Sequence, residues 1–155
     1  MKKIITIFLL FISTLYANNY QNIILEKVNE VRIENKMKPL KIDNELNKIA
    51  ILKAKDMAKE EKLSHDSKKY GLTFNIIKQR GIKFRSAAEN IARWHETPEF
   101  VVDRWLKSKG HRANILNSKY DKTGIGVAQD KAGKNYWVQI FIEENYCFSI
   151  KKMLF

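Results

Sequence analysis

The sequence is short of the residues that define several classes of protein. One cysteine among 155 residues cannot form a disulfide within the chain, and it excludes a cysteine-rich zinc site. That residue, Cys147, is expected to be a buried thiol, with intermolecular pairing as the alternative. Two prolines and six glycines argue against a collagen-like or proline-rich disordered chain. A mean hydropathy of −0.41 excludes a polytopic membrane protein. The rest of the composition is globular, and the length suits one domain with a sizeable core.

Acidic residues are also scarce, with 17 Asp and Glu against 29 Lys and Arg and a formal net charge of +12. Basic proteins often bind nucleic acid. Here the lysines are scattered with acidic residues between them, as in residues 53–62, and no arginine-rich stripe alternates with aromatic residues. We therefore expect no nucleic-acid partner. The charge is expected to form a solvated face with a weak attraction to a membrane surface or to the cell wall, through anionic lipid, peptidoglycan or acidic glycans.

The first 17 residues are expected to be a secretory signal peptide. A basic head (residues 1–3) precedes an apolar run over residues 4–16 and the small Ala17. This order is typical of an export signal, and the run is shorter than the roughly 20 residues of a membrane-spanning helix. An uncleaved anchor helix is the alternative. We expect residues 1–17 to be removed and residues 18–155 to form a single secreted or periplasmic domain.

Helical periodicity dominates the first half of that domain. Apolar residues at helical spacing predict a helix over residues 20–36. Asp43 is typical of an N-cap, and a second helix is expected to follow it and to end near Lys62. Residues 73–80 predict a short helix closed by Gly81. The second helix has a predicted buried face that contains one charged residue and three alanines, which allow close approach to a neighbour: Leu46, Ile49, Ala50, Lys53, Ala54, Met57 and Ala58.

The second half changes from helical to strand periodicity. Thr97-Pro98-Glu99 is typical of a helix start, with a cap, a proline in the first turn and then an acid. Gly110 is expected to end this helix, and residues 111–116 form a further short turn. Two strands are predicted beyond it, at residues 124–128 and 136–142, and a hairpin turn at residues 130–134 connects them. The apolar stripe of the helix is Pro98, Val101, Val102, Trp105 and Leu106.

The last predicted strand is apolar on both faces, which indicates that it is covered on both sides. Trp105 and Trp137 are therefore expected in the core. Gln139 is either a satisfied core amide, which we favour, or part of a cleft wall. Helices followed by a hairpin predict an α+β sandwich with an antiparallel sheet inside.

Three segments carry polar residues that packing alone does not explain. They contain His65, Glu89 and His111, which suit either a zinc site or a general acid/base group. The three residues are far apart in the sequence, and no compact zinc motif is present. Asn90 is expected to serve backbone hydrogen bonds. Arg112 and Asn114 are expected to be structural and to tie the turn after His111 to the sheet.

Taken in order, these segments resemble the CAP superfamily (cysteine-rich secretory proteins, antigen 5 and pathogenesis-related 1) in its short bacterial secreted form. The resemblance runs from about Ile23 to Phe141 and implies a three-layer α-β-α sandwich with a central antiparallel sheet and a cleft. It places His65, Glu89 and His111 in that cleft, where family members can bind a divalent metal. The matching motifs are Met37-Lys38-Pro39-Leu40, the helix with Leu46, Ala50, Ala54 and Met57, Ser64-His65, Ala88-Glu89-Asn90-Ile91-Ala92, Trp105 with Ser108-Lys109-Gly110-His111-Arg112-Ala113-Asn114-Ile115-Leu116, Gly124-Ile125-Gly126-Val127, and Tyr136-Trp137-Val138-Gln139-Ile140-Phe141.

The sequence departs from the family pattern at one acid of the cleft. Members with the full cleft have two histidines and two acids, and the second acid follows the first histidine by a few residues. Residues 67–70 of this sequence contain no acid. We therefore expect a three-residue site of His65, Glu89 and His111 that holds zinc or another divalent cation, with water or Asp66 as the fourth ligand.

Two classes of function remain open at this point. The first is a monomeric binding module for a lipid, a cell-wall glycan or a protein, in which any metal orders the cleft. The second is a metal-assisted hydrolase, which needs a base to activate bound water. The missing second carboxylate removes the obvious base, and no serine or cysteine stands out as a nucleophile. The binding module is therefore the favoured interpretation.

Overall fold

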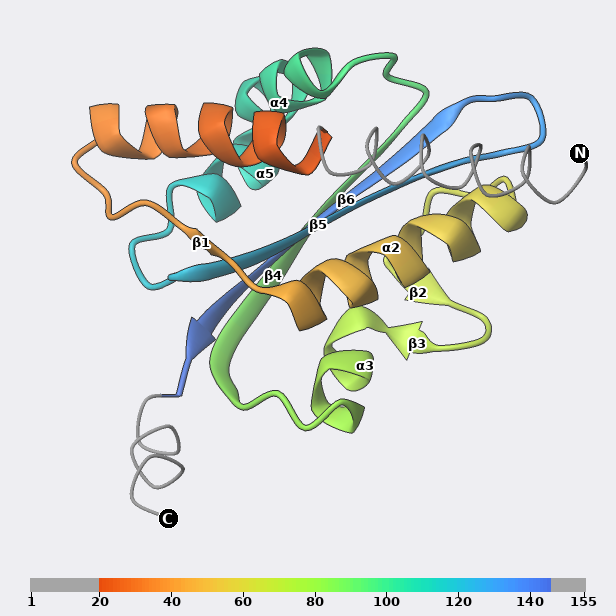
Figure 1. Ribbon diagram of the computed structural model, residues 1–155, viewed down its shortest axis with the longest axis horizontal. Helices are drawn as coiled ribbons and strands as arrows, with labels where there is room; N and C mark the ends of the chain where they lie inside the picture. The colour runs from red at the N-terminus through yellow and green to blue at the C-terminus, as the bar shows by residue number, and fades with distance from the viewer. Residues whose placement is uncertain (1–19, 146–155) are drawn as a thin grey trace, which may run out of the picture.

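The protein folds into three layers, with a sheet between two layers of helices (Figure 1). The computed structural model describes residues 20–145, so the predicted signal peptide and Cys147 lie outside the described residues. One face of the sheet is covered by the helix over residues 20–34, α4 (Pro98–Lys107) and α5 (Lys109–Ile115). The other face is covered by α2 (Asn44–Lys59) and α3 (Thr73–Gln79). The predicted α+β class and three-layer α-β-α sandwich are confirmed.

The sheet has the strand order β1-β5-β6-β4, so β5 and β6 lie in its centre. The pairs β5–β6 and β6–β4 are antiparallel, whereas the short β1 pairs with β5 in the parallel direction. A separate small hairpin pairs β2 with β3. The strands are β1 (Lys41–Ile42), β2 (Asp66–Ser67), β3 (Gly71–Leu72), β4 (Phe84–Arg93), β5 (Lys122–Gln129) and β6 (Asn135–Glu144).

The helix starts are those that capping chemistry predicts. The Asp43 carboxylate accepts the first free amide hydrogens of α2, and the Thr97 hydroxyl accepts the amide of Phe100 in α4. The expected stop at Gly110 is wrong: α4 ends at Lys107 because Ser108 is extended, and Gly110 lies inside α5. No helix within residues 20–145 is long and apolar enough to span a membrane.

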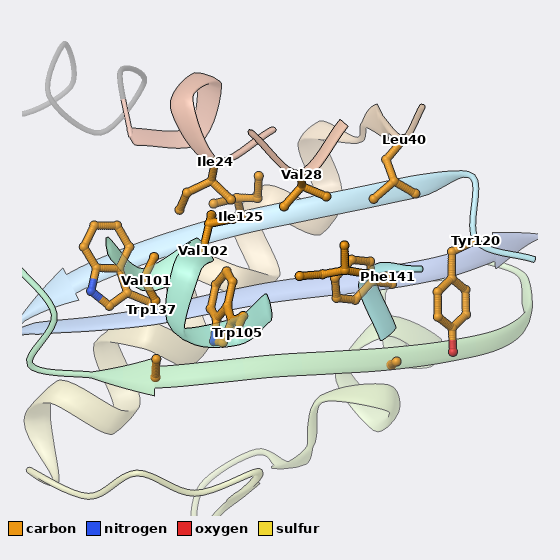
Figure 2. Packing of buried hydrophobic residues seen from close by; sticks show 13 residues of the cluster. Ile24, Val28, Leu40, Val101, Val102, Trp105, Tyr120, Ile125, Trp137 and Phe141 are labelled. Atoms are coloured by element: carbon orange, nitrogen blue, oxygen red, sulfur yellow. The ribbon is translucent and has the colours of Figure 1, made fainter. Parts of the chain in front are cut away.

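The core forms two clusters, one on each face of the sheet. All seven predicted residues of the α2 face are buried. Strand β6 contributes side chains to both clusters. Trp137 and Phe141 lie on the face covered by the 20–34 helix, and Tyr136 lies on the face covered by α2. Figure 2 shows the first cluster, in which Trp105 and Trp137 lie between the sheet and the helices. Both tryptophans are core residues, as predicted.

Gln139 is a core residue whose amide is only half satisfied. It is fully buried, and its Nε2 atom donates to the Thr123 hydroxyl at 3.3 Å. Its Oε1 atom has no hydrogen-bond partner among the described residues. The expected burial is confirmed, but the expectation of a fully satisfied amide is wrong because Trp137 and Phe141, its neighbours on that face of β6, are apolar.

Two glycines of β5 allow α2 to lie directly on the sheet. A Cβ atom on Gly124 would stand 2.2 Å from the carbonyl carbon of Leu46, and one on Gly126 would stand 2.2 Å from that of Ala50. These atoms belong to the helix backbone, which cannot rotate away as a side chain can. The backbone of α2 at Leu46 and Ala50 therefore lies against the two glycines, and this close approach fixes the layer that carries the residues next to His65.

Replacing Gly126 by alanine is expected to lower the free energy of unfolding by about 1–3 kcal/mol, because the new methyl group must push α2 off the sheet. Urea denaturation measures the change. The control is Gly110→Ala, where an added Cβ meets nothing within 4 Å and the helical position favours alanine. Equal stabilities of the two variants would contradict the close approach of α2 and β5.

Candidate functional site

His65 is the exposed member of the predicted site, and Glu89 holds it from behind. The His65 side chain is 57% exposed, whereas that of Glu89 is 3% exposed. The His65 Nδ1 atom lies 2.7 Å from Glu89 Oε1. Because an ionised carboxylate can only accept, Nδ1 carries the proton of the neutral ring. The lone pair on Nε2 therefore points away from Glu89 and is free for a ligand.

Glu89 itself is fully engaged by groups of the protein. It lies on β4 and is buried, and its second oxygen accepts the hydroxyl of Thr73, the first residue of α3. With one oxygen on His65 and the other on Thr73, the carboxylate fixes the orientation of the imidazole. Such a carboxylate behind a histidine is the usual support of a histidine ligand. Sequence reasoning missed Thr73, because a threonine at a helix start looks like an ordinary terminus.

A buried lysine supports the main chain of the same loop. Lys53 is fully buried on α2, and its Nζ atom donates to the His65 carbonyl at 2.7 Å. Burial lowers the pKa of Lys53, and the negative charges of Glu89, Asp56 and Asp66 act in the opposite direction. The sequence carried a signal for this residue, since Lys53 is the one charged member of an otherwise apolar helix face.

His111 enters the site from the opposite layer, on α5. Burial lowers the pKa of His111, and the nearby charge of His65 lowers it further. The His111 carbonyl accepts from Asn90 Nδ2 at 3.2 Å, and Asn114 Nδ2 donates to Asn90 Oδ1 at 2.8 Å. The predicted backbone hydrogen bond of Asn90 and the predicted tie between Asn114 and the sheet are confirmed.

The structure thus brings His65 and Glu89 into contact and places His111 within electrostatic reach of His65. Across residues 20–145, no three His, Cys, Asp or Glu side chains are grouped so that they could hold a metal ion. Asp66 lines a separate pocket with Asp56 and Ser64, so it does not join the site as a fourth ligand. Zinc at this site stays a prediction.

A cavity of about 310 Å³ opens beside His65. His65, Thr73 and Glu89 provide its polar wall, and the other lining residues are apolar: Leu72, Phe74, Ala87 and Ala88. Its size and composition are typical of a site for a small organic group. It lies between strand β4 and the continuous stretch that contains the β2–β3 hairpin and the start of α3, so residues 65–74 and residues 87–89 form it.

A family model and two relatives match most of this chain. The model of the cysteine-rich secretory protein family, CAP, matches residues 25–141. The chain is 39% identical over 123 residues to the "Uncharacterized protein YkwD" of Bacillus subtilis (strain 168), and the match covers 79% of this chain and 47% of that protein. It is 33% identical over 120 residues to the "Uncharacterized membrane protein YlbC" of the same organism, covering 77% and 33% of the two chains. The chain therefore matches less than half the length of either relative.

Solved structures show the same fold. A crystal structure of an extracellular protein with an SCP domain from Bacillus anthracis superposes with a TM-score of 0.74 and 30% identity, over 83% of this chain and 41% of that one. An outer surface protein from Borrelia burgdorferi superposes with a TM-score of 0.73 and 23% identity, over 80% of this chain and 92% of that one.

Proposed function

Because the chain belongs to the cysteine-rich secretory protein (CAP) family, with a match over residues 25–141, we propose that it is an exported binding module that takes a ligand in the His65 cavity. The site acts outside the cytoplasm. The order of basic, apolar and small residues at positions 1–17 supports this, as do the descriptions of two structural relatives as extracellular and outer surface proteins.

The observation that carries the proposal is the arrangement of His65 and Glu89. A buried carboxylate with both oxygens engaged orients an exposed imidazole, and the free Nε2 atom faces away from it. This arrangement prepares one nitrogen for a ligand or a metal ion. It does not favour the hydrolase alternative, because the Glu89 carboxylate is held by His65 and Thr73 and so is not free to activate water.

A divalent metal, most simply zinc, fits as the ion that orders this cleft. His65 and His111 would supply neutral imidazole nitrogens, and Glu89 would fix the His65 ring from behind. Burial and the His65 charge keep His111 neutral to lower pH than an ordinary histidine, so protons compete weakly at that ring. The ligand itself is a lipid, a cell-wall glycan or a protein group that bonds to the polar wall and places an apolar part against Leu72 and Phe74.

Calorimetric titration of the metal-stripped protein with zinc tests the site. We expect modest affinity, loss of binding in His65→Ala and His111→Ala, and a 10- to 100-fold weaker affinity in Glu89→Gln. Binding should weaken as the pH falls, because protonated imidazole cannot ligate, and the lowered pKa of His111 moves the protonation of that ring below the ordinary histidine value of about 6.5.

The matched control is His95→Ala, which removes the chain's third histidine from a segment outside the site. His95→Ala should bind zinc as the unmodified protein does. Equal zinc binding by the unmodified protein, His65→Ala and His111→Ala would remove the metal from the proposal and leave the cavity as an organic binding site.

A further inference from the structure

Two large aromatic side chains are exposed near the start of β6, where Arg93, the residue before Trp94, pairs with Tyr136. Trp94 follows β4 and is 50% exposed, and Phe100 lies in the first turn of α4 and is 51% exposed. Together with Glu96 and Thr97 they line a cavity of about 440 Å³. This cavity is separate from the one beside His65, and the aromatic residues at its rim have no role in the proposed cleft.

The backbone at Trp94 is held in an unfavourable conformation. Its φ is +69°, in the left-handed region that bulky residues rarely adopt. The Trp94 amide donates to the Asn135 carbonyl at 2.6 Å, and the next two carbonyls accept from Asn135 Nδ2 at 3.1 and 3.2 Å. The fold therefore holds this segment rigidly in place and directs a strained, apolar side chain toward water. Strain of this kind persists where it serves a function.

The charges next to Trp94 are positive. The Arg93 guanidinium lies 4.2 Å and the Lys134 ammonium 4.6 Å from the centre of the indole ring. Neither forms an ion pair with a carboxylate of residues 20–145. The pKa of His95 is lowered mainly by burial. A third cation, Arg104, lies close enough to lower it further. Glu96 is the carboxylate that lines the cavity, and the two cations lie on the Trp94 ring. We name Arg93, Trp94, Phe100 and Lys134 the aromatic surface.

We propose that the aromatic surface docks on a membrane of anionic phospholipids. Tryptophan favours the headgroup region of a bilayer, because its ring is apolar and its N–H remains hydrogen-bonded to water or lipid. Phenylalanine supplies apolar area, and the stems of arginine and lysine lie along the rings while their charges meet lipid phosphates. The excess of basic over acidic residues, which remains when residues 1–17 and their two lysines are removed, adds a long-range attraction of the same sign. This docking is independent of the His65 cavity and of any metal.

Tryptophan fluorescence is a direct probe of the contact, because Trp105 and Trp137 are 1% and 0% exposed. We expect vesicles of phosphatidylglycerol to shift the emission to shorter wavelength and brominated acyl chains to quench it. Vesicles of phosphatidylcholine should bind at least tenfold more weakly, and added salt should weaken binding to phosphatidylglycerol. No spectral change with phosphatidylglycerol, or an equal change with both lipids, would overturn the proposal.

Variants locate the contact on the protein. Trp94→Gly should bind phosphatidylglycerol vesicles at least tenfold more weakly, while its midpoint of urea denaturation rises, because glycine adopts the positive φ without strain. Phe100→Ser is an independent second variant that should also weaken binding. Binding by both variants that equals that of the unmodified protein would overturn the proposal, and would direct attention to a glycan or protein as the partner of this surface.

A charge-matched pair separates a local contact from diffuse attraction. Arg93→Gln with Lys134→Gln should weaken binding about tenfold or more and flatten the salt dependence. Lys55→Gln with Lys59→Gln removes two exposed charges from α2 and should leave binding within twofold. Equal losses in the two double variants would assign the attraction to the overall charge and overturn the proposed surface. All variants and the unmodified protein begin at residue 18, as the predicted signal-peptide cleavage leaves them, so differences between them do not arise from residues 1–17.

Discussion

Replacing Trp137 by alanine is expected to lower the free energy of unfolding by roughly 3–5 kcal/mol. The side chain is fully buried between the sheet and the 20–34 helix, where its ring meets that of Tyr20 edge-on with centroids 5.5 Å apart. Its Nε1 atom donates to the carbonyl of His95 at 2.9 Å. The substitution leaves a large cavity in the core and removes one of the two donors to the His95 carbonyl, which keeps its bond from Asn135 Nδ2, and both effects destabilise the folded state.

Urea denaturation followed by circular dichroism measures this change without relying on tryptophan fluorescence. The matched control is Trp94→Ala, in which the same side chain is removed from a half-exposed position. That variant should change the free energy of unfolding by less than about 1 kcal/mol. If Trp137→Ala also costs less than about 1 kcal/mol, the assignment of Trp137 to the core is wrong.

Local patterns were sufficient to predict the elements that have a strong period and a clear cap. The seven residues of the α2 face, the Asp43 and Thr97 caps and the two-sided burial of β6 all follow from side-chain spacing and capping chemistry. The hairpin turn at residues 130–134 follows in the same way. These features depend on residues that are neighbours in the sequence, so the sequence alone contains most of the information.

Strand β4 could not be predicted from such patterns. Its sequence, FRSAAENIAR, is poor in β-branched and aromatic residues, and it shows no alternation of apolar and polar side chains. It becomes a strand because it pairs with β6 along its length, and because Asn90 and Glu89 find polar partners on α5 and α3. These partners are distant in the sequence, and the pairing overrides a weak local preference.

The candidate site divides in the same way. The motif resemblance placed His65, Glu89 and His111 in one region, and the structure joins the first two by a hydrogen bond. The supporting role of Glu89 behind His65 could not be predicted, because it depends on the Thr73 hydroxyl, which donates to the second oxygen of Glu89. The hydrogen bond from Lys53 to the His65 carbonyl could not be predicted either, because it depends on how α2 and the loop of His65 pack together.

A buried arginine that the sequence patterns did not indicate joins the 20–34 helix to α5. Arg32 is fully buried, and burial lowers the pKa of its guanidinium. It donates to four backbone carbonyls, at distances between 2.6 and 3.0 Å, and none of these partners is a carboxylate: Lys38, Ile115, Asn117 and Tyr120. Ile115 ends α5, so the positive charge also lies at the negative end of that helix dipole. The same helix carries His111.

Replacing Arg32 by methionine is therefore expected to lower the free energy of unfolding by roughly 3–5 kcal/mol, because four carbonyls lose their donor in a site that water does not reach. Methionine keeps much of the side-chain volume, so a loss of stability of this size comes mainly from the missing hydrogen bonds and not from a cavity. Arg32→Lys should recover part of the loss, since an ammonium group has only three donors and cannot match the planar fork.

Urea denaturation measures both variants, and Arg80→Met, at an exposed position, is the control that should stay within about 0.5 kcal/mol of the unmodified protein. Because α5 positions His111, the Arg32→Met protein should also bind zinc more weakly than the Arg80→Met protein if the metal site exists. An unfolding free energy for Arg32→Met equal to that of Arg80→Met would show that the buried guanidinium contributes nothing to the junction of the two helices.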